Sequence, residues 1–264
     1  MSTQEMTGTI EQPKTATAGT SIDSRFSYEA VKVLGVFVAF VPVLFFFTSI
    51  SLGSLDPAYD WLKNTISELI WGQYGWVLAL EFCLFGIVLI ALALRLKINF
   101  AVDIKSKLAL VLLMLIGIGF LIIAVFPTRA PGAAQSISGL IHQNTVRVMA
   151  GLFPASCLLF GAGVKRGPQT AIIRIQSLAA GVMGIVLIVP GAVATLTDSA
   201  WLGAIERIIL INGLLWIEVI TLSVTFPGII NHLNKHLGSG LTARIDFQGI
   251  LAASLPTLNE RRLR

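Results

Sequence analysis

The chain has 264 residues, of which 55% are hydrophobic and only 12% are charged. Soluble domains carry roughly 25% charged residues, so the composition excludes an ordinary soluble protein. The net charge is +5, but the Lys and Arg residues stand in tails and short loops between apolar runs, a pattern that orients a membrane protein and does not indicate nucleic-acid binding.

The N-terminal residues 1–28 are rich in Ser and Thr and lack an apolar period, so we expect a disordered tail. Residues 31–52 form an apolar run that is too long for the core of a signal peptide. We expect this run to be an uncleaved first membrane span. The following residues 53–74 are too polar for the centre of a bilayer and contain two Trp and two Tyr residues, which are typical of a membrane interface.

Five further apolar runs occupy residues 75–94, 108–126, 146–164, 175–196 and 203–226. Each is long enough to cross a bilayer as a helix. The sequence therefore predicts an all-α polytopic membrane protein, with a bundle of six transmembrane helices within residues 29–228 and a basic tail at 229–264. In the fifth run, Gly181 and Gly184 are expected to allow close helix approach. Both cysteines, Cys83 and Cys157, lie in predicted spans, so no disulfide framework is indicated.

The distribution of positive charge predicts the orientation of the six spans. All but four of the 19 Lys and Arg residues lie on the side that holds both tails and two basic loops. The four on the other side are Lys63, Arg129, Arg147 and Arg207. By the positive-inside rule both termini are cytoplasmic, and we expect a multi-pass membrane protein.

The longest polar interruption, at residues 126–147, reads FPTRAPGAAQSISGLIHQNTVR. Together with the two other connections on the same side, it collects ionisable residues near the outer leaflet, where such groups are normally paired or functional. The predicted ligand-binding set is Glu68, Glu81, Arg129, His142, Arg147, Glu206 and Arg207. Its three acids and three arginines can balance one another, and His142 adds a group that titrates near neutral pH.

Several of these residues also have simple structural interpretations. Thr65 and Glu68 fit a capping box at the start of a helix, and Arg129 can extend to lipid head groups. Glu206 and Arg207 are neighbours on a helix and point about 100° apart, so we expect each to reach a different neighbouring span.

Other polar residues suggest further sites with less support. Glu218 shares a helix face with Arg207, but a hydrogen bond to another span is favoured over a proton path because no third acid continues the series. His232 and His236 have a spacing compatible with metal binding, yet they lack the glutamate of a metalloprotease motif. We predict no metal and no cofactor, and no established catalytic motif is present.

Four short motifs carry a resemblance to a known family. They are Ile66-Ser67-Glu68-Leu69, Phe126-Pro127, the His142 that follows, and Ala204-Ile205-Glu206-Arg207. With these motifs the chain resembles the six-span prokaryotic membrane proteins of domain of unknown function 998 over about residues 31–226. The resemblance implies six helices and a location in a prokaryotic cytoplasmic membrane, and it supplies no activity. Where that pattern has an acid soon after Phe-Pro, this chain has Thr128-Arg129, which argues against a metal held by such an acid and His142.

Three functions, besides that of a purely structural subunit, are consistent with these residues. The leading hypothesis is a membrane protein that binds a lipid head group or a small amphiphile at the outer-leaflet cluster, without covalent chemistry. A membrane-embedded lipid hydrolase is the alternative, with Glu68 or Glu81 as general base and His142 as acid or metal ligand. A proton-linked transporter using Glu81 and Glu218 is a further alternative. The expected partners are membrane lipid and a small amphiphile.

Overall fold

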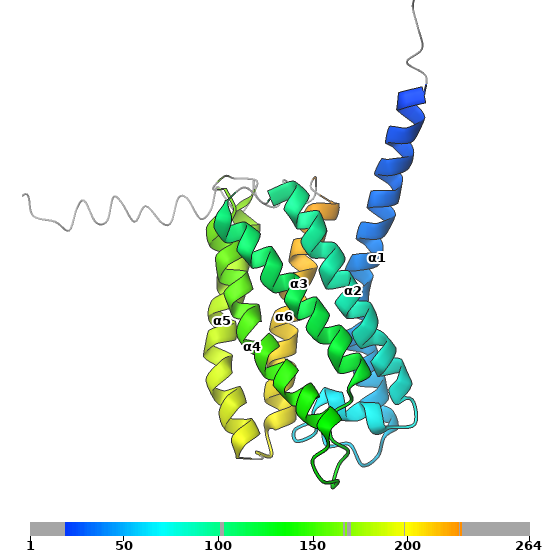
Figure 1. Ribbon diagram of the computed structural model, residues 1–264, viewed down its shortest axis with the longest axis vertical. Helices are drawn as coiled ribbons and strands as arrows, with labels where there is room; N and C mark the ends of the chain where they lie inside the picture. Colours follow the sequence, from blue (N-terminus) through cyan, green and yellow to red (C-terminus); the bar gives the residue numbers. More distant parts are fainter. Residues whose placement is uncertain are drawn as a thin grey trace, which may run out of the picture. The chain divides into compact units, whose positions relative to one another are not determined.

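The computed structural model describes residues 19–100, 103–165, 167, 170–197, 199–226 and 228. Within them the chain forms six long α-helices and one short 3-10 helix, and these residues contain no β-strand (Figure 1). The helices are α1 (Gly19–Leu55), η1 (Ile66–Trp71), α2 (Gly75–Phe100), α3 (Ile104–Val125), α4 (Ile137–Gly163), α5 (Ala171–Leu196) and α6 (Leu202–Thr225). The described part of the chain thus confirms the predicted all-α fold.

Each long helix contains an apolar segment of 21 to 27 residues. At about 1.5 Å per residue, such a segment covers the roughly 30 Å hydrocarbon core of a bilayer. The prediction of six membrane-spanning helices is therefore confirmed. The orientation of these helices, with cytoplasmic termini, stays a prediction from the Lys and Arg distribution.

Helix α1 begins at Gly19, before the boundary expected at residue 28. The chain divides into two compact units, Met1–Leu34 and Gly35–Arg264, and the following description concerns the second unit alone. Residues 1–18 and 229–264 lie outside the described residues. Residues 1–18 of the disordered tail expected at 1–28, the basic tail, His232 and His236 are therefore not placed. Residues 19–28 of the expected tail belong to α1.

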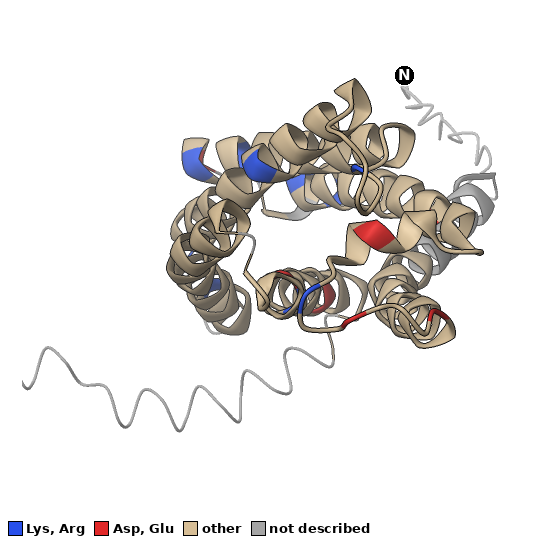
Figure 2. Ribbon diagram, turned by 90° about the horizontal axis from the view of Figure 1, so that it is seen from below, with Lys and Arg blue, Asp and Glu red and all other residues tan. Residues whose placement is uncertain are grey.

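Consecutive helices from α2 to α6 pack side by side. Helix α1 lies against both α2 and α6, because Phe45 stacks on two rings of α2 and a Cβ atom on Gly35 would lie 2.6 Å from Thr225 Oγ1 of α6. Seen along the helices, the second unit is a ring of helices (Figure 2). The contact between Gly35 and Thr225 makes α1 and α6 neighbours.

The connections gather at the two ends of the bundle. We call the end that holds the α1–α2 connection the η1 end, because η1 lies in this connection. The α5–α6 connection meets it there, since the Gly203 amide donates to Lys63 O. The α3–α4 connection joins the same end through Trp71 Nε1, which donates to Thr128 O at 3.1 Å (lower end in Figure 1). The connections expected on one side of the membrane thus lie at one end of the bundle.

Small residues set the distance between neighbouring helices. A Cβ atom on Gly181 of α5 would lie 2.6 Å from the Leu158 side chain of α4, and one on Gly184 would lie 3.0 Å from Pro154 Cβ. The predicted close approach through these two glycines is confirmed. Gly86 of α2 and Gly117 of α3 also face each other, and a Cβ atom on either would lie within 2.8 Å of the carbonyl oxygen of the other.

Candidate functional site

The start of α6 is joined to the α1–α2 connection by backbone hydrogen bonds. The Gly203 and Ala204 amides donate to Lys63 O and Leu62 O at 3.2 and 3.0 Å. These amides belong to the first turn of the helix, where no carbonyl of the same helix is available to accept from them. A Cβ atom on Gly203 would lie 2.2 Å from Asn64 O, so only glycine permits this contact. We call the contacts between residues 59–66 and 203–207 the junction.

Arg207 holds the junction from the side of α6. Its Nη1 donates to Trp61 O at 2.9 Å and to Asn64 O at 3.0 Å, and its Nη2 donates to the Tyr59 hydroxyl. The guanidinium carbon also lies 5.4 Å from the centre of the Tyr59 ring and 5.1 Å from that of Trp61. Aromatic faces attract a cation at such distances. The Arg207 side chain therefore has a structural role at the junction.

Two acids complete the same region. Glu206 Oε2 accepts from the Ile66 amide at 2.7 Å. Glu68 Oε2 accepts from Asn64 Nδ2 at 2.7 Å and from the Thr65 amide at 3.2 Å, so the carboxylate half of the predicted capping box is confirmed. The expectation that Glu206 and Arg207 reach different spans is wrong: both bind the α1–α2 connection, because that connection folds over the start of α6.

The pH response of Tyr59 gives a test of the junction. Burial raises the pKa of Tyr59 to about 12, although Arg207 beside it acts in the opposite direction. The pKa of an unfolded tyrosine is about 10. Because folding raises this pKa, the stability contributed by the neutral phenol is fully present below about pH 10 and is lost as the pH rises from about 10 to 12.

This pH response can be measured as the difference in tyrosinate absorbance between the wild type and Tyr59→Phe, since the other tyrosines are common to both proteins. We expect the difference to titrate with a midpoint near pH 12. A midpoint close to that of free tyrosine, about 10, would contradict the burial of this hydroxyl.

His142 lies inside the bundle near the start of α4, with only 3% of its surface exposed. Ser136 caps this helix by accepting from the Gly139 amide at 3.0 Å, and Ser138 Oγ donates to Pro127 O at 2.8 Å. These contacts fix the turn that precedes the histidine. His142 Nδ1 is 2.9 Å from Phe126 O. A carbonyl oxygen only accepts, so Nδ1 carries the proton and, in the neutral ring, Nε2 is an acceptor.

The Nε2 atom of His142 is buried and has no hydrogen-bond partner among the described residues. Buried polar atoms are normally paired, and an unpaired one needs an explanation. His142 lines a cavity of about 170 Å³ inside the bundle. This cavity provides the space in which a ligand can reach the ring.

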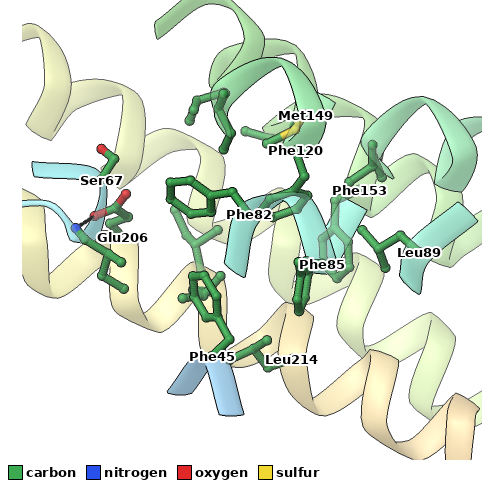
Figure 3. A pocket seen from close by; sticks show the side chains of 18 of the residues that line it. Phe45, Ser67, Phe82, Phe85, Leu89, Phe120, Met149, Phe153, Glu206 and Leu214 are labelled. Carbon is green, nitrogen blue, oxygen red and sulfur yellow. Dashed lines mark hydrogen bonds between the residues drawn. The ribbon is translucent and has the colours of Figure 1, made fainter. Parts of the chain in front are cut away.

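The walls of the cavity are almost wholly apolar and come from η1 and from every long helix except α5. Aromatic rings from four helices form much of the wall (Figure 3). They belong to Phe45, Phe82, Phe85, Phe120 and Phe153. Lining residues on α4 run from His142 to Phe153, which is about 16 Å along a helix. The cavity is thus long and narrow.

One end of the cavity is polar. Ser67 and Glu206 lie next to each other on the side away from the phenylalanine rings, and Glu206 bonds to the backbone of η1 there (Figure 3). His142 lines the same cavity and, like Glu206, stands close to the start of its helix, at the η1 end of the bundle. We call Ser67, His142 and Glu206 the polar end. No Lys or Arg side chain is among the described residues that line the cavity.

The remaining predicted site residues lie elsewhere. Glu81 is 4% exposed but does not line the cavity. Its hydrogen-bonding neighbour is Thr48 of α1. Glu81 Oε2 has no partner within the described part of the chain. Arg129 is exposed, and Arg147 is exposed with a 3.2 Å bond to Asn144 Oδ1. The structure therefore brings Glu206 and Arg207 together at the junction, with Glu68 beside them in the α1–α2 connection, and both His142 and Glu206 line the cavity.

Sequence reasoning missed the cavity walls and the partners of Arg207. The only signal for Ser67 was its place beside Glu68 in the motif Ile66-Ser67-Glu68-Leu69. Tyr59 and Trp61 were expected only as interface aromatics. Glu218 Oε2, expected to bond to another span, has no partner among the described residues, and these residues contain no group of three or more His, Cys, Asp or Glu side chains suited to a metal ion.

A family model described as Protein of unknown function (DUF998) matches residues 39–223. This match includes the three residues of the polar end and both sides of the junction, and it confirms the resemblance seen in the sequence. No curated protein and no solved structure matches the chain.

Proposed function

The chain belongs to the DUF998 family of proteins of unknown function, and from its cavity we propose that it binds a small amphiphile inside the helix bundle. One observation carries this proposal. A long apolar cavity is lined by a buried histidine whose Nε2 has no partner among the described residues. An apolar tail fits the walls, and a polar head at the other end of the same molecule satisfies the ring.

The size of the cavity favours one chain over a two-chain lipid. An apolar cavity of about 150 Å³ engineered into another protein binds benzene, and the cavity here measures about 170 Å³ and is narrow. The tail gains little from leaving membrane lipid, because lipid chains are as apolar as the cavity walls. Selectivity therefore depends on the shape of the cavity and on the polar end.

The orientation predicted from Lys and Arg places the polar end toward the outer leaflet. An amphiphile in that leaflet carries its head group at the depth of the η1 end. The proposed binding site is therefore not the whole cluster expected from the sequence, because Arg129, Arg147 and Arg207 do not line the cavity.

Filling the cavity tests the proposal. A Cβ atom on Gly213 would meet only Phe153, at 3.7 Å, so Gly213→Leu places its remaining atoms in the cavity without a clash at Cβ. We expect the wild type to retain a small amphiphile after purification in mild detergent, and Gly213→Leu to retain at least about tenfold less, equivalent to 1.4 kcal/mol of binding free energy. Mass spectrometry of the intact complexes measures the retention.

Gly151→Leu is the matched control, since Gly151 lies on the exposed face of α4 and a Cβ atom there has nothing within 4 Å. It should retain the amphiphile as the wild type does, and so should Arg147→Ala. Equal retention by wild type and Gly213→Leu would contradict binding in the cavity. Loss of retention in Arg147→Ala would instead support the cluster expected from the sequence.

No contact among the described residues specifically supports the hydrolase or the transport alternative. The hydrolase hypothesis pairs His142 with Glu68 or Glu81, and neither acid lines the cavity. The transport hypothesis needs Glu81 and Glu218 to act together, and no described contact joins them. Both therefore stay predictions from the sequence.

A further inference from the structure

The polar end places hydrogen-bond acceptors beside the cavity, where His142 Nε2 is enclosed in the wall. His142 Nδ1 donates its proton to Phe126 O, which leaves Nε2 as an acceptor in the neutral ring. A head group that only accepts, such as a ketone, cannot pair with this nitrogen. The histidine therefore favours a head group that donates a hydrogen bond.

Glu206 adds to this preference. Its Oε2 accepts from the Ile66 amide, and its Oε1 has no hydrogen bond to any described residue. In its ionised form the Glu206 carboxylate accepts and does not donate. A ligand that lies against ionised Glu206 is stabilised when it carries a donor or a positive charge, and an anionic head group is repelled at close range.

The cation nearest to Glu206 in the sequence is not available to a ligand. The Arg207 side chain donates to Trp61 O, Asn64 O and the Tyr59 hydroxyl at the junction. It does not line the cavity, and neither does any other Lys or Arg of the described residues. A phosphate or carboxylate head would therefore be buried without a cation, which is costly.

We propose, on the basis of the proposed function, that the ligand is a single-chain amphiphile whose head group is a hydroxyl or an amine, and that anionic lipids are excluded. The shared chemistry is a donor that binds His142 Nε2. An amine differs from a hydroxyl by its positive charge, so an amine also interacts with the charge of Glu206.

Four probes with the same tail test this inference: octanol, octylamine, octanoate and octyl phosphate. Each is added to the purified full-length protein in mild detergent, and bound probe is measured by mass spectrometry of the intact complex. The Gly213→Leu variant is the blank for probe that partitions into detergent or onto the protein surface. We expect octanol and octylamine to bind at least about tenfold more than the two anions, a difference of 1.4 kcal/mol or more.

Two variants assign the roles of the side chains. His142→Asn keeps an amide donor near the position of Nδ1 for Phe126 O but removes Nε2, so binding of octanol and octylamine should fall about tenfold while thermal stability is retained. Glu206→Gln keeps an acceptor for the Ile66 amide but removes the charge. It should lower binding of octylamine to the level of octanol and leave octanol unchanged.

The outcomes separate the two proposals. Binding of none of the four probes above the Gly213→Leu blank overturns the proposed function. Binding of octanoate or octyl phosphate equal to that of octanol overturns the head-group inference and leaves amphiphile binding in place. Unchanged octanol binding in His142→Asn also overturns the inference, because Nε2 would then not hold the head group.

Discussion

Replacing Arg207 by alanine is expected to lower the free energy of unfolding by about 3–5 kcal/mol, because it removes three hydrogen bonds donated by a half-buried, charged guanidinium. The side chain donates to two backbone carbonyls and to the Tyr59 hydroxyl and lies against two aromatic rings. Its loss leaves Trp61 O without this donor and leaves Asn64 O only the Tyr59 hydroxyl at 3.3 Å. It also removes the positive charge beside Glu206. Unpaired buried acceptors cost about 1–3 kcal/mol each, and such costs do not add fully.

Thermal unfolding in detergent, followed by circular dichroism, measures this effect. At about 2–4 °C per kcal/mol for a chain of this size, the midpoint should fall by roughly 10 °C. Arg207→Lys should recover less than half of the loss, because an ammonium group cannot reproduce the planar fork of the guanidinium.

Arg147→Ala is the matched control for charge. Arg147 is exposed and bonds only to the Asn144 side chain, so its replacement should change stability by no more than about 0.5 kcal/mol. Equal losses in the two arginine variants would show that the junction does not hold the α1–α2 connection to α6.

Adding a methyl group at Gly117 is expected to destabilise the protein by about 1–3 kcal/mol, the usual cost of overpacking. A Cβ atom there would lie 2.8 Å from Gly86 O and 2.8 Å from Ile90 Cγ1. A Cβ atom on Gly86 would lie 2.6 Å from Gly117 O. Backbone atoms cannot move aside as side chains do, so α2 and α3 must separate. The same thermal measurement applies, and the double variant should lose more than either single one.

Gly151→Ala should have the opposite sign. A Cβ atom at Gly151 meets nothing within 4 Å, and alanine is favoured over glycine within a helix by about 0.5–1 kcal/mol. The variants Gly86→Ala, Gly117→Ala and Gly151→Ala each add one methyl group to a helix, and they differ in the atoms that this group meets. A wild-type or higher midpoint for Gly117→Ala would show that α2 and α3 are not in close contact at these glycines.

The six spans could be predicted because lipid requires long apolar helices, whatever the details of their packing. The cavity could not, because the side chains that face lipid are as apolar as those that face the interior. Phe85 is 2% exposed and Ile87 is 56% exposed, although they stand two positions apart in the same helix. A soluble helix would carry a polar residue at one of these positions and so reveal its buried face.

The candidate site was predicted in part. Membrane depth selected His142 and Glu206 correctly as residues near one end of the bundle, since polar groups at that depth are few. The sequence could not distinguish Arg207, which binds backbone carbonyls, from Arg147, which is exposed. The partners of Arg207 lie more than 140 positions earlier in the chain, so no local pattern contains them.

The two sides of the junction are synthesised at different times, because they lie far apart in the chain. Ile66 leaves the ribosome 140 residues before Glu206, its partner in the folded protein. At about 5–20 residues per second, the α1–α2 connection waits roughly 7–28 s for α6 to be made. Until then Glu206 is absent and the ring of helices is open, so the polar end of the cavity is completed only by the last span to enter the membrane.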